Sequence, residues 1–110
     1  MEQEEFMFYG IYFDVKEIPK NSEAFKEYAE LDRNNFVDHY LGDVFGNFCF
    51  GYHKPSKKCF LSLYGIYGET TTDEFKKLIK RFDMGELKKE LEKIQLFFGL
   101  NKTVNWYFLI

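Results

Sequence analysis

Two strongly apolar segments flank one short lysine-rich turn, and this arrangement constrains the fold more than any other feature of the chain. "FGNFCFGYH" (45–53) and "CFLSLYGIY" (59–67) are rich in aromatic and β-branched residues, and "KPSKK" (54–58) separates them. Such runs on either side of a turn are typical of the two strands of a β-hairpin. The sequence therefore predicts a hairpin here, with a five-residue connection that leaves its register open.

Two further apolar segments predict two further strands. "EFMFYGIYFDV" (5–15) is nearly all apolar, and "TVNWYFLI" (103–110) has a similar composition at the other end of the chain. Runs of this length, rich in aromatic and β-branched residues, are typical of strands. With the hairpin, they bring the expected number of strands to four.

A first helix is expected between the first strand and the hairpin. Apolar residues recur at helical spacing over 23–41, Ser22 is placed to cap the helix, and Gly42 is placed to end it. The polar stretch "DRNN" (32–35) is an alternative point of interruption.

A second helical region is expected between the hairpin and the last strand. It begins at the capping box in "TTDE" (71–74), and a second start of the same kind follows at "DMGE" (83–86). We expect either two short helices or one helix bent near Gly85.

The order strand–helix–strand–strand–helix–strand predicts an α+β fold of the ferredoxin-like type, a four-stranded antiparallel sheet with the helices on one face. In that arrangement the first and third strands are central and the last strand lies at an edge. The two most apolar strands are the first and the third, as this topology requires. At 110 residues the chain is expected to form one domain, 1–110.

Alternation along the two central strands separates an aliphatic set of side chains from an aromatic set. Successive side chains of a strand point to opposite faces, and the aliphatic set is expected against the helices. The face without helices should then carry the aromatic set, which is Phe6, Phe8, Tyr12, Phe60 and Tyr64. A large uncovered apolar patch of this kind marks an interface with a partner. The alternative is a curled sheet or a covering loop, which would make these rings part of a core.

The last strand carries a second candidate interface. "VNWYFLI" contains no charge and no proline, the two features that commonly prevent an edge strand from pairing with another chain. We therefore expect that this edge, which includes Trp106, or the aromatic face is covered by a second copy of the chain or by a partner protein.

Charge is distributed unevenly along the chain. Residues 1–50 contain 11 acidic and 4 basic residues, whereas residues 51–110 contain 7 acidic and 11 basic ones. The acidic half is a candidate surface for a basic protein, and the alternative is a face that only keeps the protein in solution. The candidate contacts in the acidic half are Glu23, Glu27, Glu30 and Asp32; those for an anion such as phosphate are Lys54, Lys57 and Lys58 at the hairpin tip.

No catalytic or metal-binding motif stands out. Cys49 and His53 are four residues apart on a strand, about 13 Å, which is too far for both to bind one zinc ion. Ser56 and Ser62 lack the flanking residues of a nucleophilic serine, and no glycine-rich phosphate loop is present. We therefore expect a protein that is not an enzyme and that uses no metal or cofactor.

No apolar run is long enough to span a membrane, and the acidic start "MEQEEF" does not have the pattern of a signal peptide. A cytoplasmic location without membrane contact is therefore expected. In that reducing environment Cys49 and Cys59 should be free thiols.

Composition and size direct the functional hypothesis. The chain has 13 Lys but 2 Arg and is rich in Phe, Tyr, Ile and Asn, a bias that AT-rich codons produce. With the lack of catalytic motifs, this favours a small inhibitor from a phage or mobile element that blocks a nuclease-type partner by occlusion, of the anti-CRISPR or immunity-protein type. The alternatives are a module that stacks single-stranded nucleic acid on its sheet, and a structural subunit that self-associates.

Overall fold

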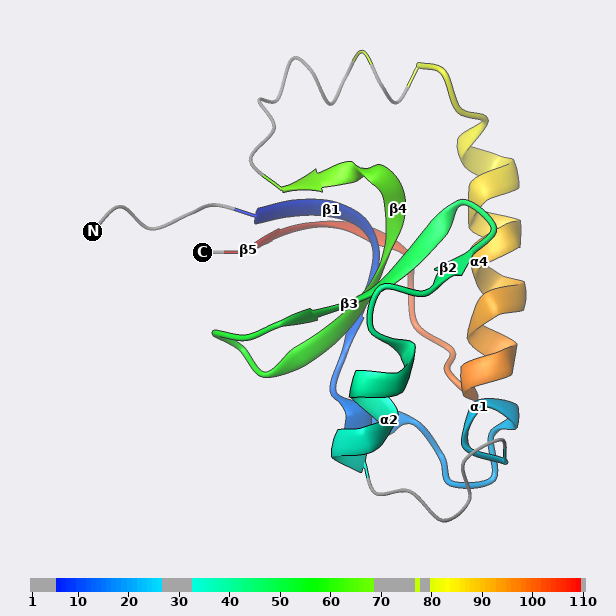
Figure 1. Cartoon of the computed structure of the whole chain (residues 1–110). Helices are drawn as coiled ribbons and strands as arrows, with labels where there is room; N and C mark the ends of the chain where they lie inside the picture. Colours follow the sequence, from blue (N-terminus) through cyan, green and yellow to red (C-terminus); the bar gives the residue numbers. More distant parts are fainter. Residues whose placement is uncertain (1–5, 27–32, 69–76, 78–79, 110) are drawn as a thin grey trace.

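The computed structural model describes residues 6–26, 33–68, 77 and 80–109 (Figure 1). Within those ranges the chain forms one antiparallel sheet of five strands and three α-helices, which makes the fold α+β. In chain order the elements are β1 (Phe6–Phe13), the 3-10 turn η1 (Val15–Glu17), α1 (Glu23–Lys26), α2 (Arg33–Tyr40), β2 (Val44–Phe45), β3 (Phe48–His53), β4 (Lys58–Gly68), α4 (Met84–Phe98) and β5 (Asn105–Leu109).

The strands lie in the order β2-β3-β4-β1-β5, and every neighbouring pair is antiparallel. β1 and β4 therefore each have a strand on both sides, whereas β5 lies at an edge of the sheet. These are the central and edge positions expected from the apolar character of the first, third and last strands.

The sheet has one strand more than the four expected, because the segment 45–53 is not a single strand. Val44–Phe45 forms the short strand β2, and a turn at Gly46 and Asn47 reverses the chain into β3. Gly46 has a φ of 61°, which glycine adopts without strain. Glu90 of α4 holds this turn, because its carboxylate accepts hydrogen bonds from the backbone N–H of Asn47 at 2.7 Å and from the side-chain amide at 2.8 Å.

α1 and α2 lie at the two ends of the helix expected over 23–41, and residues 27–32 between them are outside the described ranges. α2 ends at Tyr40, and Gly42 follows with a φ of 84°, close to the predicted end of the helix.

α4 begins at the second predicted start, "DMGE" (83–86), as expected, and it is not bent at Gly85. The Asp83 carboxylate caps α4 by accepting hydrogen bonds from the backbone N–H groups of Gly85 and Glu86, at 3.0 and 3.2 Å. Gly85 therefore lies in the first turn of α4, which ends at Gly99 with a φ of 68°. Most of the segment 71–82, where another helix was expected, lies outside the described residues.

The helices lie on one side of the sheet, and the main core fills the space between the two layers (Figure 1). Ile11, Leu61 and Leu63, which alternation assigned to this face, are fully buried there. The prediction of which face meets the helices is thereby confirmed. The helical side chains in the same cluster are Ala24, Phe25, Phe36, Val37, Tyr40, Leu87, Leu91 and Phe98.

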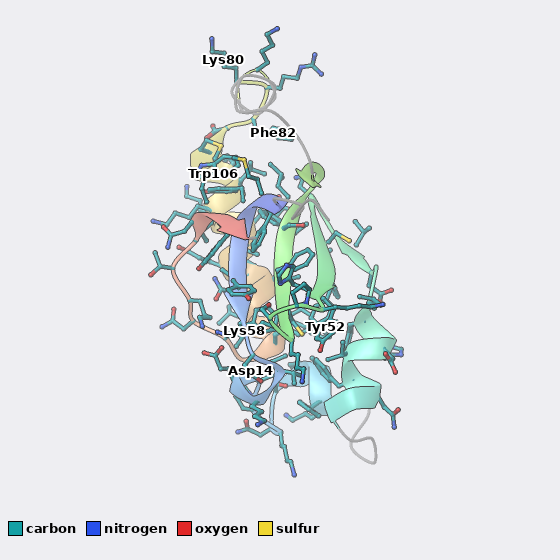
Figure 2. All side chains as sticks on the ribbon, turned by 90° about the vertical axis from the view of Figure 1, so that its left-hand side faces the viewer. Asp14, Tyr52, Lys58, Lys80, Phe82 and Trp106 are labelled. Carbon is teal, nitrogen blue, oxygen red and sulfur yellow. The ribbon has the colours of Figure 1, made fainter. Side chains whose placement is uncertain are left out.

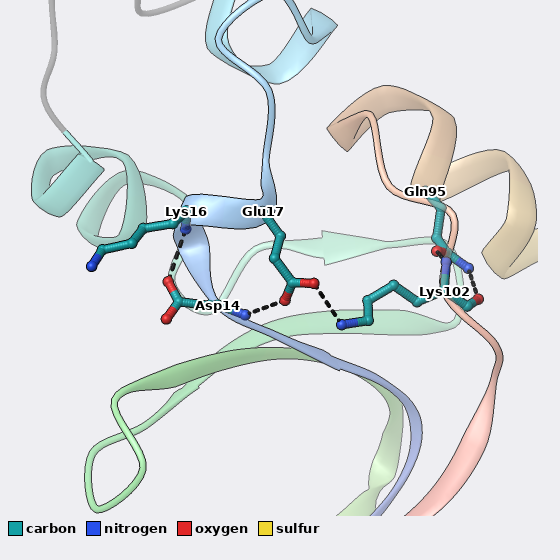
Figure 3. Close-up of polar contacts among 5 residues, drawn as sticks. All are labelled: Asp14, Lys16, Glu17, Gln95 and Lys102. Carbon is teal, nitrogen blue, oxygen red and sulfur yellow. Dashed lines mark hydrogen bonds and ion pairs between the residues drawn. The ribbon is translucent and has the colours of Figure 1, made fainter.

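A polar network fixes the segment that leads from α4 to β5 (Figure 3). The buried Gln95 side chain donates from Nε2 to the carbonyl oxygen of Lys102 at 2.9 Å and accepts from the Lys102 N–H at 2.6 Å. The Lys102 ammonium also donates to Glu17 at 2.8 Å, and this hydrogen bond lowers the pKa of the Glu17 carboxyl. These contacts join the end of α4, the start of β5 and the turn that follows β1.

The sheet bends sharply, so that the β3–β4 hairpin and the outer ends of β1 and β5 project to the same side, away from α4 (Figure 1). The register between β1 and β4 shifts between Phe8 and Gly10, which marks an irregularity in the ladder. At this point the two backbones approach so closely that a Cβ on Gly10 would overlap the carbonyl group of Leu61. The close approach of the two central strands therefore requires glycine at position 10.

We expect Gly10→Ala to lower the free energy of unfolding by about 1–3 kcal/mol, the usual effect of overpacking an interior. Gly85→Ala is the matched control, because its Cβ would meet only a side-chain oxygen of Asp83 at 3.3 Å and alanine favours a helix. Urea unfolding followed by circular dichroism measures both. Equal stability of wild type and Gly10→Ala would show that the two backbones can separate at no cost.

Candidate functional site

The face of the sheet without helices carries four aromatic rings in mutual contact, and we call Phe8, Tyr12, Phe60 and Tyr107 the aromatic cluster. Phe8 lies at its centre and stacks on Phe60 and on Tyr107, with centroids 5.0 Å apart in each pair. Tyr12 flanks Phe8 at 6.2 Å and Tyr107 at 5.6 Å. The rings come from the neighbouring strands β4, β1 and β5, so the cluster joins three strands. Figure 2 shows this side of the sheet, with α4 behind the strands.

Glycine in the neighbouring strand makes room for this cluster. Gly51 of β3 is the register partner of Phe60, and a Cβ at Gly51 would overlap the Phe60 ring. The ring therefore lies flat over the backbone of β3. A side chain at position 51 would push Phe60 away from Phe8 and open the stack.

The cluster lies where alternation predicted it, but it is not the bare platform that was expected. Phe8 has no exposed surface and Phe60 is only 9 % exposed. Tyr12 and Tyr107 are partly exposed and form the outer part of the cluster. Two rings of the sequence-predicted surface are thus a second small core, because the sheet bends and neighbouring rings cover them. The side chains of Phe6 and Tyr64 are not among those described.

A basic turn borders the aromatic cluster. The ammonium group of Lys58 lies 5.2 Å from the centre of the Tyr12 ring, a cation–π contact. Lys58 lies at the lower end of the sheet, on the same side as Asp14 (Figure 2). Lys54 and Lys57 are exposed in the connecting turn, where Lys57 adopts a φ of 58°. The three lysines predicted as anion contacts therefore lie in or next to one turn, and one of them, Lys58, contacts the Tyr12 ring.

A serine–histidine pair at the hairpin tip was not expected from the sequence. Ser56 Oγ lies 2.7 Å from Nδ1 of His53, and the Ser56 backbone N–H donates to the same nitrogen at 3.3 Å. The only sequence signal for this pair is the spacing of three residues between His53 and Ser56 across a turn, where a serine can bond to a neighbouring group. Both contacts lie within one turn, in which the Lys57 N–H donates to the His53 carbonyl at 2.9 Å. The pair therefore stabilises the hairpin tip.

Two other predicted contacts that the structure describes, Trp106 and Glu23, lie apart from the aromatic cluster. Trp106 is the register partner of Tyr9, and the two rings are tilted with centroids 4.8 Å apart, so Trp106 lies on the opposite face of the sheet, 40 % exposed. Glu23 is exposed on α1, and its Oε1 lies 3.9 Å from the Nζ of Lys26. Glu27, Glu30 and Asp32 lie outside the described residues. Of the predicted contacts that the structure describes, Trp106 and Glu23 therefore lie apart from the aromatic cluster.

The two cysteines lie on opposite faces of the sheet. Cys59 belongs to the main core, whereas Cys49 is the register partner of Ser62 on the other face. Both are free thiols, as expected. Burial raises the pKa of Cys59 to about 12 and also raises the pKa of Cys49. Both thiols therefore stay protonated near neutral pH and are poor nucleophiles and poor metal ligands.

The described residues offer no grouping of three or more His, Cys, Asp or Glu side chains that could hold a metal ion. The hydroxyl of Ser62, which lies opposite Gly10 in the sheet, is buried and has no hydrogen-bond partner among the described residues.

A hollow of about 850 Å³ runs along the exposed side of α4. Its charged side chains are of both signs, including Glu86, Lys89 and Lys93. Gln95 also lines it, but its amide is already bonded to the backbone of Lys102. No buried polar group there remains to orient a ligand, so the aromatic cluster with its basic border is the stronger candidate site.

Comparison of the chain with family models, curated proteins and solved structures finds no match. Within the described ranges, no helix has the length and apolar character that crossing a bilayer requires.

The raised pKa of Cys59 predicts a stability that falls at alkaline pH. The unfolded thiol loses its proton above about pH 8.5, whereas the folded thiol keeps it until about pH 12, so the unfolded state is favoured progressively between those values. Between pH 8 and pH 10, wild type should lose about 1–2 kcal/mol more unfolding free energy than Cys59→Ala. Urea unfolding of both proteins at the two pH values measures this. Identical losses would mean that the Cys59 thiol is not desolvated.

Proposed function

We propose that this protein is a non-enzymatic binding protein, and that it holds a partner protein against the face of the sheet without helices. The observation that carries the proposal is the layered aromatic cluster, in which the partly exposed Tyr12 and Tyr107 rest on the buried Phe8. Tyrosines held in place by packed rings lose little entropy on binding, and such anchors are typical hot spots of protein interfaces.

The more specific role that we propose is that of an inhibitor from a phage or mobile element. It would act in the cytoplasm by blocking a nuclease-type partner, in the manner of anti-CRISPR or immunity proteins. This part of the proposal is based on the composition of the chain and on its size. The frame would be ferredoxin-like, with β2 as an added edge strand. The basic border at Lys54, Lys57 and Lys58 favours an acidic patch on the partner beside the tyrosines.

Single-stranded nucleic acid is the second candidate partner. The observation in its favour is Lys58, which lies over Tyr12 at the edge of the rings, since sites for single strands combine stacking platforms with basic side chains. Against it, Phe8 stacks on two other rings, so no face of this central ring is free for a base. A protein partner is therefore favoured.

Replacing Tyr12 should separate binding from stability. Immobilised wild-type protein is used to recover partners from cells of the source organism, and the affinity of the purified partner is then measured by calorimetry. We expect Tyr12→Ala to weaken binding by about 30-fold or more, because truncating an anchoring ring costs about 2 kcal/mol. Tyr52→Ala is the matched control, since Tyr52 is also partly exposed but packs against the main core.

The class of partner is decided in the same experiment. A partner that survives nuclease treatment of the eluate, with no binding of single-stranded oligonucleotides in fluorescence anisotropy at low salt, supports the protein interface. Tight oligonucleotide binding that Lys58→Ala weakens would select the nucleic-acid function instead. If Tyr12→Ala and Tyr52→Ala have the same effect on affinity, the aromatic cluster is ordinary core and the proposal fails.

A further inference from the structure

β5 forms an unprotected edge of the sheet. It is the last strand in the order β2-β3-β4-β1-β5, and in the described part of the chain it pairs with β1 alone. Its sequence "NWYFL" contains neither a charge nor a proline. An edge strand leaves alternate backbone N–H and C=O groups unpaired, and natural monomers protect such edges with charges, prolines or short length.

The opposite edge of the sheet is protected in one of these ways. β2 has two residues, Val44–Phe45, so it offers little backbone for another strand. β5 is longer, with the five residues Asn105–Leu109. Any edge-to-edge pairing of this sheet is therefore expected at β5, and because the other edge is short, the pairing would end at two copies.

We infer that β5 pairs antiparallel with β5 of a second copy, so that the two sheets join into one. Identical strands that carry charges repel each other, whereas every residue of β5 is uncharged and three of the five are aromatic. Backbone hydrogen bonds would be supplied by the same groups on both copies.

The symmetry of this pairing fixes where the two aromatic clusters lie. In an antiparallel pair of identical strands the two-fold axis runs perpendicular to the sheet, so the helix-free faces of both copies lie on the same side. Full overlap of Asn105–Leu109 places Tyr107 opposite its own counterpart. Directly opposed residues have Cβ atoms about 5 Å apart. The partly exposed Tyr107 rings would thus meet at the axis, and two clusters would form one continuous binding surface.

This self-association does not depend on which partner binds the aromatic cluster, and it is tested without one. The mass of the purified chain is measured by light scattering and sedimentation over a range of concentrations up to about 1 mM. We expect a dimer whose dissociation constant rises at least ten-fold in Asn105→Lys, since the new charge lies on the pairing strand. Thr103→Lys is the matched control, because Thr103 is exposed and precedes the strand. It should leave dissociation unchanged.

Amide hydrogen exchange then identifies the contact. In a monomer every second amide of β5 lacks an acceptor and exchanges quickly, whereas in the proposed dimer all of them are protected at high concentration. Circular dichroism checks that both lysine variants are folded. If a variant is unfolded, the exchange rates of the β5 amides in the wild type still decide whether β5 forms the contact. A monomeric mass at about 1 mM overturns the inference. A dimer whose alternate β5 amides still exchange quickly overturns it too, since the contact would lie elsewhere.

Discussion

Both apolar layers of the molecule depend on the central strand β1. Its side chains Tyr9, Ile11 and Phe13 enter the core beneath the helices, whereas Phe8 and Tyr12 belong to the aromatic cluster on the other face. Because β1 pairs with β4 on one side and β5 on the other, each layer can join several strands. Full burial of a side chain such as Phe8 contributes about 1.5–3 kcal/mol. The sheet is therefore stabilised from both faces, although helices cover only one.

On the face of the sheet without helices, the buried rings stabilise the sheet, and the partly exposed rings are the proposed contacts with a partner. Phe8 and Phe60 are enclosed by their neighbours and by the backbone at Gly51. Tyr12 and Tyr107 present the remaining surface, and the Lys58 ammonium lies beside it. In the proposed function, binding energy and folding energy would thus come from different members of one cluster. This division is why a truncation at the outer layer can report on binding.

Alternation and apolar composition were sufficient to predict the central strands, the edge position of β5 and the face that the described side chains of the central strands occupy. They left open whether Phe8 is exposed or buried by a curled sheet, because periodicity assigns a face but says nothing of how far a sheet bends. The turn at Gly46 and Asn47 carried a recognisable two-residue signal, yet the aromatic run around it read as one strand. The bond from Asn47 to Glu90 joins residues far apart in the chain, which no local pattern reveals.

The hydrogen bonds of the Gln95 amide also affect the position of β5. They hold the backbone of Lys102, three residues before β5, and so fix the point at which the last strand enters the sheet. A slip of a single residue there would exchange the two sides of the strand, turning Tyr107 toward the helices and Trp106 toward the opposite surface. One uncharged side chain at the end of a helix thereby determines which aromatic residue joins the helix-free face.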